Sequence, residues 1–381
     1  MQRHEERRLN LVNLLLARLA HPRAIAMWDF SWLERRWPGA GYENPTRALD
    51  ELAERGYDAV RIDAYPHLVS ADSRREWELL PCWSVQDWGS PALNRVRVQP
   101  HLDEFLAACA ARGIAVGLSS WYREDRAQMR LRIRSPEEHA DQWIATVQAI
   151  DPALRARLLF VDLCNEWPLA VWAPFFPQEA NCAGDDWGTP ASLAWMRRAV
   201  ARFRDAFPGL PVTFSTSSTP EHYLDTELPG FDLIEAHLWM ANATDFYRRV
   251  GYSYERFSPV GYENVVQHAE ALYRASPAEW QTSLHARIDF LAECGRRQKL
   301  PLITTEGWAI VDYKDWPLLD WGWVKELTAL GAEWAAATGR WAAIATSNFC
   351  GPQFHGMWSD IAWHQRLTHL IRHGELPDHS A

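Results

Sequence analysis

Residues 99–121 read QPHLDEFLAACAARGIAVGLSSW, and this stretch decides the fold. Its first part, Gln99 to Arg112, has a helical pattern, and Gly113 follows as a helix stop. Its second part, Ile114 to Trp121, is a short and mostly apolar run that predicts a buried strand. A helix that leads directly into a buried strand is the repeating unit of a parallel sheet covered by helices.

The same alternation continues along the chain in both directions. The sequence predicts eight strands, at Ala24–Trp32, Tyr57–Ala64, Ile114–Trp121, Leu158–Cys164, Pro211–Ser217, Phe231–Trp239, Pro301–Thr305 and Arg340–Ser347. Helices are predicted at Pro45–Arg55, Gln99–Arg112, from Ser135-Pro136 onward, from Thr189-Pro190 to about Phe207, and at Ser283–Gln298, Trp323–Thr338 and Asp360–His373. Eight such units predict an α/β fold, a (β/α)₈ TIM barrel. The alternative, an open doubly wound sheet, would be favoured by a G-x-G-x-x-G motif after the first strand, and the sequence has none.

The predicted barrel takes up most of the chain. We expect a single domain over residues 1–381, with a helix within residues 1–22 and the barrel over about residues 24–373. Two long segments, Tyr65–Val98 and Ala241–Thr282, follow the second and sixth strands. They are expected to form long βα loops over the C-terminal face of the barrel.

Charge and cysteine content disfavour several classes of protein. Asp and Glu outnumber Lys and Arg by 49 to 39, for a net charge of −10, so a nucleic-acid partner is not expected. The six cysteines form no C-x-x-C pair, and we interpret them as free thiols of a reducing compartment. Leu9 to Ala20 is apolar, but Glu5 and Glu6 occupy the place of a signal peptide's basic region, and the leucine spacing suits an amphipathic helix. With no apolar run of about 18 residues, no membrane partner is expected, and a cytoplasmic location is predicted.

The chain is unusually rich in aromatic rings, with 22 Trp, 11 Tyr and 14 Phe. Many lie in segments that also hold Pro, Gly and Asp, such as Leu79 to Pro91 and Asn165 to Pro177. Rings in loops could grip a sugar, which has apolar C–H faces and a polar rim, or they could close gaps between loops. For any single Trp both interpretations stay open.

Two predicted strands end in a glutamate. The fourth strand ends in Cys164-Asn165-Glu166-Trp167-Pro168, and the seventh in Thr304-Thr305-Glu306-Gly307-Trp308. Catalytic groups of TIM barrels lie at the C-terminal ends of the strands. Cleavage of a glycoside needs two carboxylates, one to protonate the leaving oxygen and one to attack the anomeric carbon or activate water. The fourth and seventh strands face each other across the barrel, so Glu166 and Glu306 are the predicted catalytic pair.

Here the chain resembles clan A of the glycoside hydrolases, and within it a cellulase-like, family-five-like protein. The resemblance rests on Asn165-Glu166 and Glu306, with support from Arg61 in VRID and from His237 at the end of strand six. It implies a retaining enzyme in which Glu166 is the acid/base and Glu306 the nucleophile. It further implies that Asn165 binds the sugar 2-hydroxyl and that Arg61 keeps Glu306 ionised.

The sequence departs from the family pattern at two positions. Trp239 stands where the family usually has a Tyr that touches the nucleophile. Strand eight ends in Ser347-Asn348-Phe349 rather than in a Trp that forms the floor under the sugar, and Trp358 lies further on. We therefore expect a rebuilt sugar-binding floor.

The remaining strand-end residues are weaker candidates for sugar contacts, with hydrogen bonds between loops as the alternative. The predicted substrate-binding set consists of Arg61, Asn165, His237, Trp28, Asp29, Asp63, Tyr65, His67, Trp121, Tyr122, Trp167, Trp239, Trp308, Asn348 and Trp358. An apolar wall such as Trp167 would raise the pKa of Glu166. His369 and His373 have metal-ligand spacing, but they lie on the last helix, away from the barrel mouth, so no metal and no cofactor is predicted.

The predicted function is a retaining glycoside hydrolase for β-linked glycosides or short oligosaccharides, and the long loops favour exo action. The alternative is a catalytically silent sugar-binding barrel. The expected partner is a carbohydrate substrate, whereas the sequence does not distinguish a monomer from a homo-oligomer.

Overall fold

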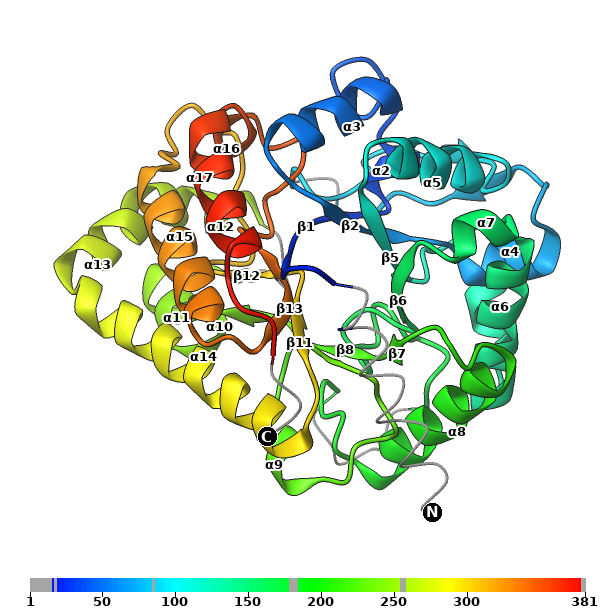
Figure 1. Cartoon of the computed structure of the whole chain (residues 1–381). Helices are drawn as coiled ribbons and strands as arrows, with labels where there is room; N and C mark the ends of the chain where they lie inside the picture. Colours follow the sequence, from blue (N-terminus) through cyan, green and yellow to red (C-terminus); the bar gives the residue numbers. More distant parts are fainter. Residues whose placement is uncertain (1–15, 17–18, 84–85, 178–183, 254–257, 378–381) are drawn as a thin grey trace.

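The computed structural model describes residues 16, 19–83, 86–177, 184–253 and 258–377 (Figure 1). Its main sheet has the strand order β7-β6-β5-β2-β1-β13-β11-β9-β8, and every pair in it is parallel. The strands are β1 (Arg23–Asp29), β2 (Ala59–Asp63), β5 (Ala115–Ser119), β6 (Leu158–Asp162), β7 (Val212–Thr213), β8 (Ser215–Thr216), β9 (Ile234–Ala236), β11 (Leu302–Thr304) and β13 (Trp341–Ala345). They form the ring at the centre of Figure 1.

The predicted fifth strand is split, and the split completes the ring. β7 pairs with β6 and β8 pairs with β9, on either side of Phe214. The backbone N–H of Ser215 donates to the Asp162 carboxylate at 2.8 Å, which draws it away from the regular ladder. Strands β7 and β8 thus occupy one of eight positions, and the TIM barrel is confirmed against the open doubly wound sheet.

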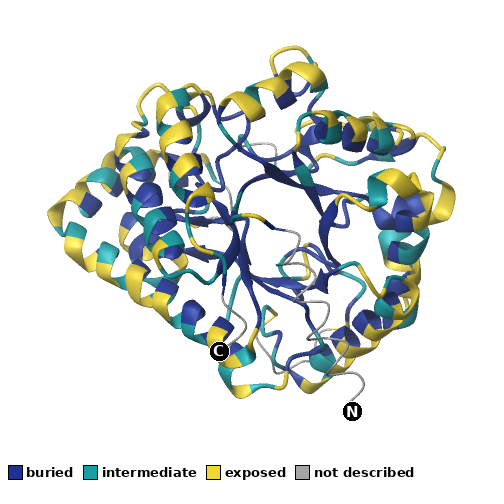
Figure 2. Cartoon of the chain, viewed as in Figure 1, coloured by how far each residue is buried: buried dark blue, intermediate teal, exposed yellow. Residues whose placement is uncertain are grey.

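Helices surround the ring, with buried faces toward the strands and exposed faces outside (Figure 2). The outer layer contains α3 (Pro45–Glu54), α5 (His101–Ala111), α6 (Pro136–Ala149), α7 (Pro152–Arg155), α8 (Pro190–Ala206), α9 (His222–Asp225), α14 (Pro277–Gln298), α15 (Gly322–Ala337), α16 (His355–Trp358) and α17 (Ile361–Arg372). The predicted start of α6 is confirmed, because the Ser135 side chain accepts the Glu138 N–H at 3.2 Å. The Glu138 carboxylate reaches back to the N–H of Arg134, one residue before the cap.

The largest differences from the predicted elements lie in the long loops. These loops hold α4 (Pro66–Asp72), β3 (Trp77–Leu79), β4 (Asn94–Val96), α10 (Met240–Ala243), α11 (Phe246–Val250), α12 (Pro259–Asn264), the π turn η2 (Val265–Ala269) and α13 (Glu270–Ala275). The 3₁₀ turn η1 (Met129–Arg132) lies in the loop after β5. The first strand is shorter than predicted, because the Asp29 carboxylate accepts the Ser31 N–H and turns the chain into α2 (Ser31–Glu34).

Three expectations about the whole chain can also be compared with the structure. The predicted N-terminal helix falls almost entirely outside the described residues. Five cysteines, all except Cys182, which lies outside the described residues, are free thiols. Among the described residues, no helix is long and apolar enough to cross a membrane.

Candidate active site

A cavity of about 1000 Å³ opens at the C-terminal ends of the strands. Eight residues of the predicted site line it: Asp29, Trp121, Asn165, Glu166, His237, Trp239, Glu306 and Asn348. The loop elements supply further walls, among them Trp83, Trp172, Tyr247 and Asp312. Residues from seven different strand ends or loops therefore meet in one space.

Two of the central side chains sit at interruptions in the strands. His237 separates β9 from β10 (Leu238–Trp239), and Glu306 lies between β11 and β12 (Gly307–Trp308). β10 and β12 pair with each other and continue the barrel wall beyond the break. The seventh barrel strand is interrupted because a buried acid binds its backbone there. The Glu235 carboxylate accepts the N–H and the hydroxyl of Thr305 at 3.1 and 2.6 Å.

His237 lies between the two predicted catalytic carboxylates. Its Nδ1 is 3.1 Å from Glu166 Oε1 and 3.6 Å from Glu306 Oε1. An oxygen of Glu166 and an oxygen of Glu306 lie within 4.8 Å of each other. The Nε2 of His237 is 3.4 Å from Glu235, so three carboxylates surround one imidazole.

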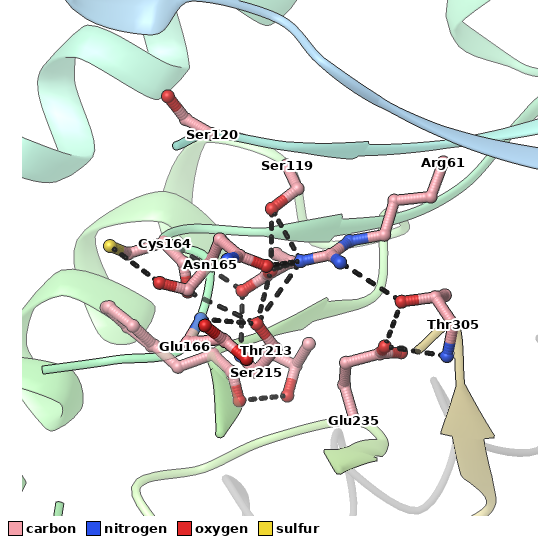
Figure 3. Close-up of polar contacts among 12 residues, drawn as sticks. Arg61, Ser119, Ser120, Cys164, Asn165, Glu166, Thr213, Ser215, Glu235 and Thr305 are labelled. Atoms are coloured by element: carbon pink, nitrogen blue, oxygen red, sulfur yellow. Dashed lines mark hydrogen bonds and ion pairs between the residues drawn. The ribbon is translucent and has the colours of Figure 1, made fainter. Parts of the chain in front are cut away.

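Arg61 is fully buried, and its guanidinium lies among polar side chains from several strands (Figure 3). Its guanidinium donates to Asp162 at 2.6 Å, to Asn165 Oδ1 at 2.7 Å and to Glu306 at 3.2 Å. The hydroxyls of Ser119 and Ser215 complete the network with Asp162. Arg61 therefore lies near Glu306 as predicted, but it shares its charge with a closer and fully buried carboxylate.

The pKa shifts of the two glutamates run opposite to the roles that the resemblance implies. Burial raises the pKa of Glu306 to about 7, with the negative charge of Glu166 adding to the effect and His237 and Arg61 opposing it. Burial also pushes the pKa of Glu166 upward, but the hydrogen bond and charge of His237 outweigh it and leave that pKa below its ordinary value. Within the pair, burial thus favours the protonated form of Glu306, while His237 favours the ionised form of Glu166.

His237 itself is a cation. Burial lowers the pKa of this imidazole, but the charge of Glu306 and the hydrogen bonds with Glu166 and Glu235 raise it to about 10. At neutral pH the imidazolium form of His237 is therefore favoured, and both glutamates face it.

Two tryptophans follow Glu166 in the loop after the fourth barrel strand. The Trp167 ring packs beside Trp195 and Phe214 and donates its indole N–H to Ser192. The residue that reaches Glu166 is Trp172, whose indole N–H donates to Oε2 at 3.2 Å. Nothing in the sequence singles out Trp172 from the other rings of this segment.

Several other predicted sugar contacts lie outside the cavity. Each has a partner in the protein: the Trp28 indole binds the Cys350 carbonyl, Asp63 accepts from Tyr65 and Trp121, Tyr65 binds Phe30, His67 binds Arg123, Tyr122 binds Leu163, and the Trp308 indole binds the Ala345 carbonyl. Trp358 stacks on Tyr57 and donates to Glu51, behind the barrel wall. A strand-end side chain can turn toward the helix layer as readily as toward the mouth, so the sugar contacts predicted for these residues stay predictions.

Sequence reasoning missed two buried acids and one acid of the cavity wall. Asp162 and Glu235 are fully buried within otherwise apolar strands, and that interruption of the apolar run was the signal for them. Asp312 lines the cavity, and burial raises its pKa to about 7.

Four turns after consecutive barrel strands have a left-handed residue. Asp29, Tyr65, Tyr122 and Glu166 have φ values of 41°, 50°, 38° and 47°. Non-glycine residues are held in this region only when the surroundings enforce it, and such residues cluster at functional sites. The turn at Glu166 places its carboxylate against His237 and Trp172.

Comparisons with known proteins agree with this geometry. The family model described as "Cellulase-like: Sugar-binding cellulase-like" matches residues 25–372. A crystal structure of a candidate glycoside hydrolase from Parabacteroides distasonis ATCC 8503 is 49% identical, covers 94% of this chain and 96% of its own, and has a TM-score of 0.92. The β-glycosidase BGL167 is 13% identical over 94% of this chain and 98% of its own, with a TM-score of 0.49. A GH5_18 protein from Streptomyces cattleya in complex with GlcNAc is 14% identical over 85% of this chain and 70% of its own, with a TM-score of 0.46.

No curated protein matches the sequence. The family match spans nearly the whole barrel, and the relative from Parabacteroides distasonis is similar over the same extent. The chain therefore belongs to the cellulase-like family.

Proposed function

We propose that this protein is a retaining glycosidase for β-linked glycosides, with Glu166 as acid/base and Glu306 as nucleophile. The observation that carries the proposal is the separation of the two carboxylates, whose nearest oxygens lie within 4.8 Å. Retaining enzymes hold their carboxyl groups about 5–5.5 Å apart, whereas inverting enzymes need about 6.5–9.5 Å to admit a water. A direct attack by one carboxylate on the anomeric carbon fits the shorter spacing.

The proposed roles require the proton of the pair to move from Glu306 to Glu166 when the substrate binds. A retaining cycle starts with one proton on the pair, which is the state that a buried pair beside the His237 cation adopts between the two pKa values. Cleavage of the glycosidic bond needs that proton at the leaving oxygen beside Glu166. Arg61 and His237 both stay charged and stabilise Glu306 as it becomes the anion that attacks.

The roles are tested by a pair of variants assayed with nitrophenyl glycosides. Glu306→Ala removes the nucleophile, so turnover should vanish for every leaving group, and added azide should restore it with an inverted glycosyl azide. Glu166→Ala removes the proton donor, which typically contributes about 10²–10⁴-fold and mostly for poor leaving groups. Dinitrophenyl glycosides should therefore still react, and azide should then give the retained product. Exchanged azide products would reverse the two roles.

Early-time proton NMR of the product sugar is an independent test of stereochemistry. The wild-type enzyme should release the β-anomer first from a β-glycoside. Initial release of the α-anomer would contradict the retaining mechanism while leaving a glycosidase in place.

A further inference from the structure

Among the buried polar atoms that have no hydrogen-bond partner in the described residues are two on residues next to β12. They are the indole Nε1 of Trp239 and the amide Oδ1 of Asn348. Both residues line the cavity, and their exposed fractions are 2% and 1%. An unsatisfied buried donor or acceptor costs about 1–3 kcal/mol, so each calls for an explanation.

The backbone fixes the Trp239 ring in place. Trp239 pairs in register with Trp308 of β12, and the preceding residue, Leu238, donates its N–H to the Glu306 carbonyl. The ring meets the His237 imidazole edge-on, with centroids 5.8 Å apart. Trp239 therefore lies on a paired strand, directly after the residue that binds the backbone carbonyl of Glu306.

The orientation of the Asn348 amide is equally defined. Its backbone N–H donates to the Gly307 carbonyl at 2.8 Å, and its Nδ2 donates to the Val311 carbonyl at 2.8 Å. Because Nδ2 must face a carbonyl, the free atom is the acceptor Oδ1. The backbones of Trp239 and Asn348 thus both bind the short strand β12, and one residue carries a free donor and the other a free acceptor.

A hydroxyl group both accepts from an N–H and donates to a carbonyl oxygen. We propose that Trp239 and Asn348 form a hydroxyl-recognition pair that selects the sugar ring held beside Glu306, with the indole as donor and the amide oxygen as acceptor. This inference rests on the proposed glycosidase function. It gives Trp239 a role that differs from that of the Tyr usual at this position, since the indole contacts the substrate and not the nucleophile.

The test compares kcat/KM for a parent nitrophenyl glycoside and its monodeoxy analogues in the wild type, Trp239→Phe and Asn348→Ala. Each variant should lower kcat/KM of the parent about 10- to 100-fold. For one deoxy analogue the same variant should have little further effect, because the lost hydroxyl and the lost protein group are partners. Trp308→Phe is the matched control: its indole N–H already binds the Ala345 carbonyl at 2.8 Å outside the cavity, so the ratio between parent and analogues should not change.

Three results would overturn the inference. An equal loss for the parent and for every analogue in Trp239→Phe, with a shifted pH profile, would mean that the indole acts on Glu306. An unchanged parent rate in a folded variant would mean that water satisfies these atoms. A changed ratio of kcat/KM between parent and analogues in Trp308→Phe would also overturn the inference. The changes in the other variants would then come from a general loss of packing in the cavity wall.

A wild-type protein that hydrolyses no glycoside would refute the proposed function separately. In that case calorimetric titration with glucose, galactose and mannose tests the pair alone. Weaker binding of one monosaccharide to Trp239→Phe than to the wild type supports the pair. Equal binding, or no binding to the wild type, overturns it.

Discussion

At the scale of single residues, the centre of the site is one cation among three acids. His237 is held charged by Glu166, Glu306 and Glu235, and in return it lowers the pKa of both catalytic carboxyls. The two glutamates behave as one titrating pair, so their pKa values describe the pair as a whole. This coupling determines how activity depends on pH.

We expect a bell-shaped dependence of kcat/KM on pH. Below the lower pKa, which lies under the ordinary glutamate value, both carboxyls are protonated and no nucleophile is present. Above about 7 both are ionised and no proton donor remains, so activity falls as pH rises through that value. Replacing the cation in His237→Gln should move both limbs to higher pH. Initial rates at low substrate concentration give the profile, and an alkaline limb that stays in place in His237→Gln would contradict the role of the imidazolium.

At the scale of elements, the ends of strands β2, β6 and β11 are joined by a buried polar network. Arg61 and Asp162 are both fully buried, and their charged atoms are 2.6 Å apart. Replacing such a pair by apolar groups can be neutral, whereas removing one partner leaves a buried charge uncompensated. The network holds Asn165 and Glu306 at the mouth through the same guanidinium.

Asp162→Asn should therefore lower the free energy of unfolding by about 3–5 kcal/mol. Glu137→Gln is the control, since it breaks an exposed pair with Arg198 at 2.7 Å and should cost no more than about 1 kcal/mol. Urea unfolding of both variants and the wild type measures the difference. Equal midpoints for the two variants would show that Asp162 does not carry the charge of Arg61.

The strands and the residues at their ends show which parts of the fold and of the site were predictable from the sequence. The strands were predictable because each is a short apolar run, and Glu166 and Glu306 stood out as acids at the ends of such runs. The sequence did not predict whether the other strand-end side chains point into the cavity or toward the helices. That direction depends on contacts with residues that are far away in the sequence. Trp358 is the clearest case: the sequence made it a candidate sugar contact, and its ring packs on Tyr57, about 300 residues earlier.

At the scale of the whole molecule, the cavity opposes negative charge. The chain has a net charge of −10, and burial raises the pKa of three acids of the cavity wall: Asp29 to about 8, Asp312 to about 7 and Glu306 to about 7. Arg287 also lines the cavity, but it is paired with Glu221 at 2.8 Å. An anionic group that enters the cavity meets the same burial and the same acidic neighbours.

We therefore expect the cavity to favour neutral sugars over uronic acids. One pKa unit corresponds to a tenfold change in equilibrium, so a substrate carboxylate that experiences a shift like that of Glu306 should lose about 10²-fold in kcat/KM at neutral pH. Matched nitrophenyl β-glucuronide and β-glucoside differ only in that group, and their ratio of kcat/KM measures the penalty. The penalty should shrink as the pH is lowered, because the wall acids then become neutral, and Arg287→Gln should leave the ratio unchanged. A glucuronide turned over as fast as the glucoside, and slowed by Arg287→Gln, would instead identify Arg287 as a receptor for the carboxylate.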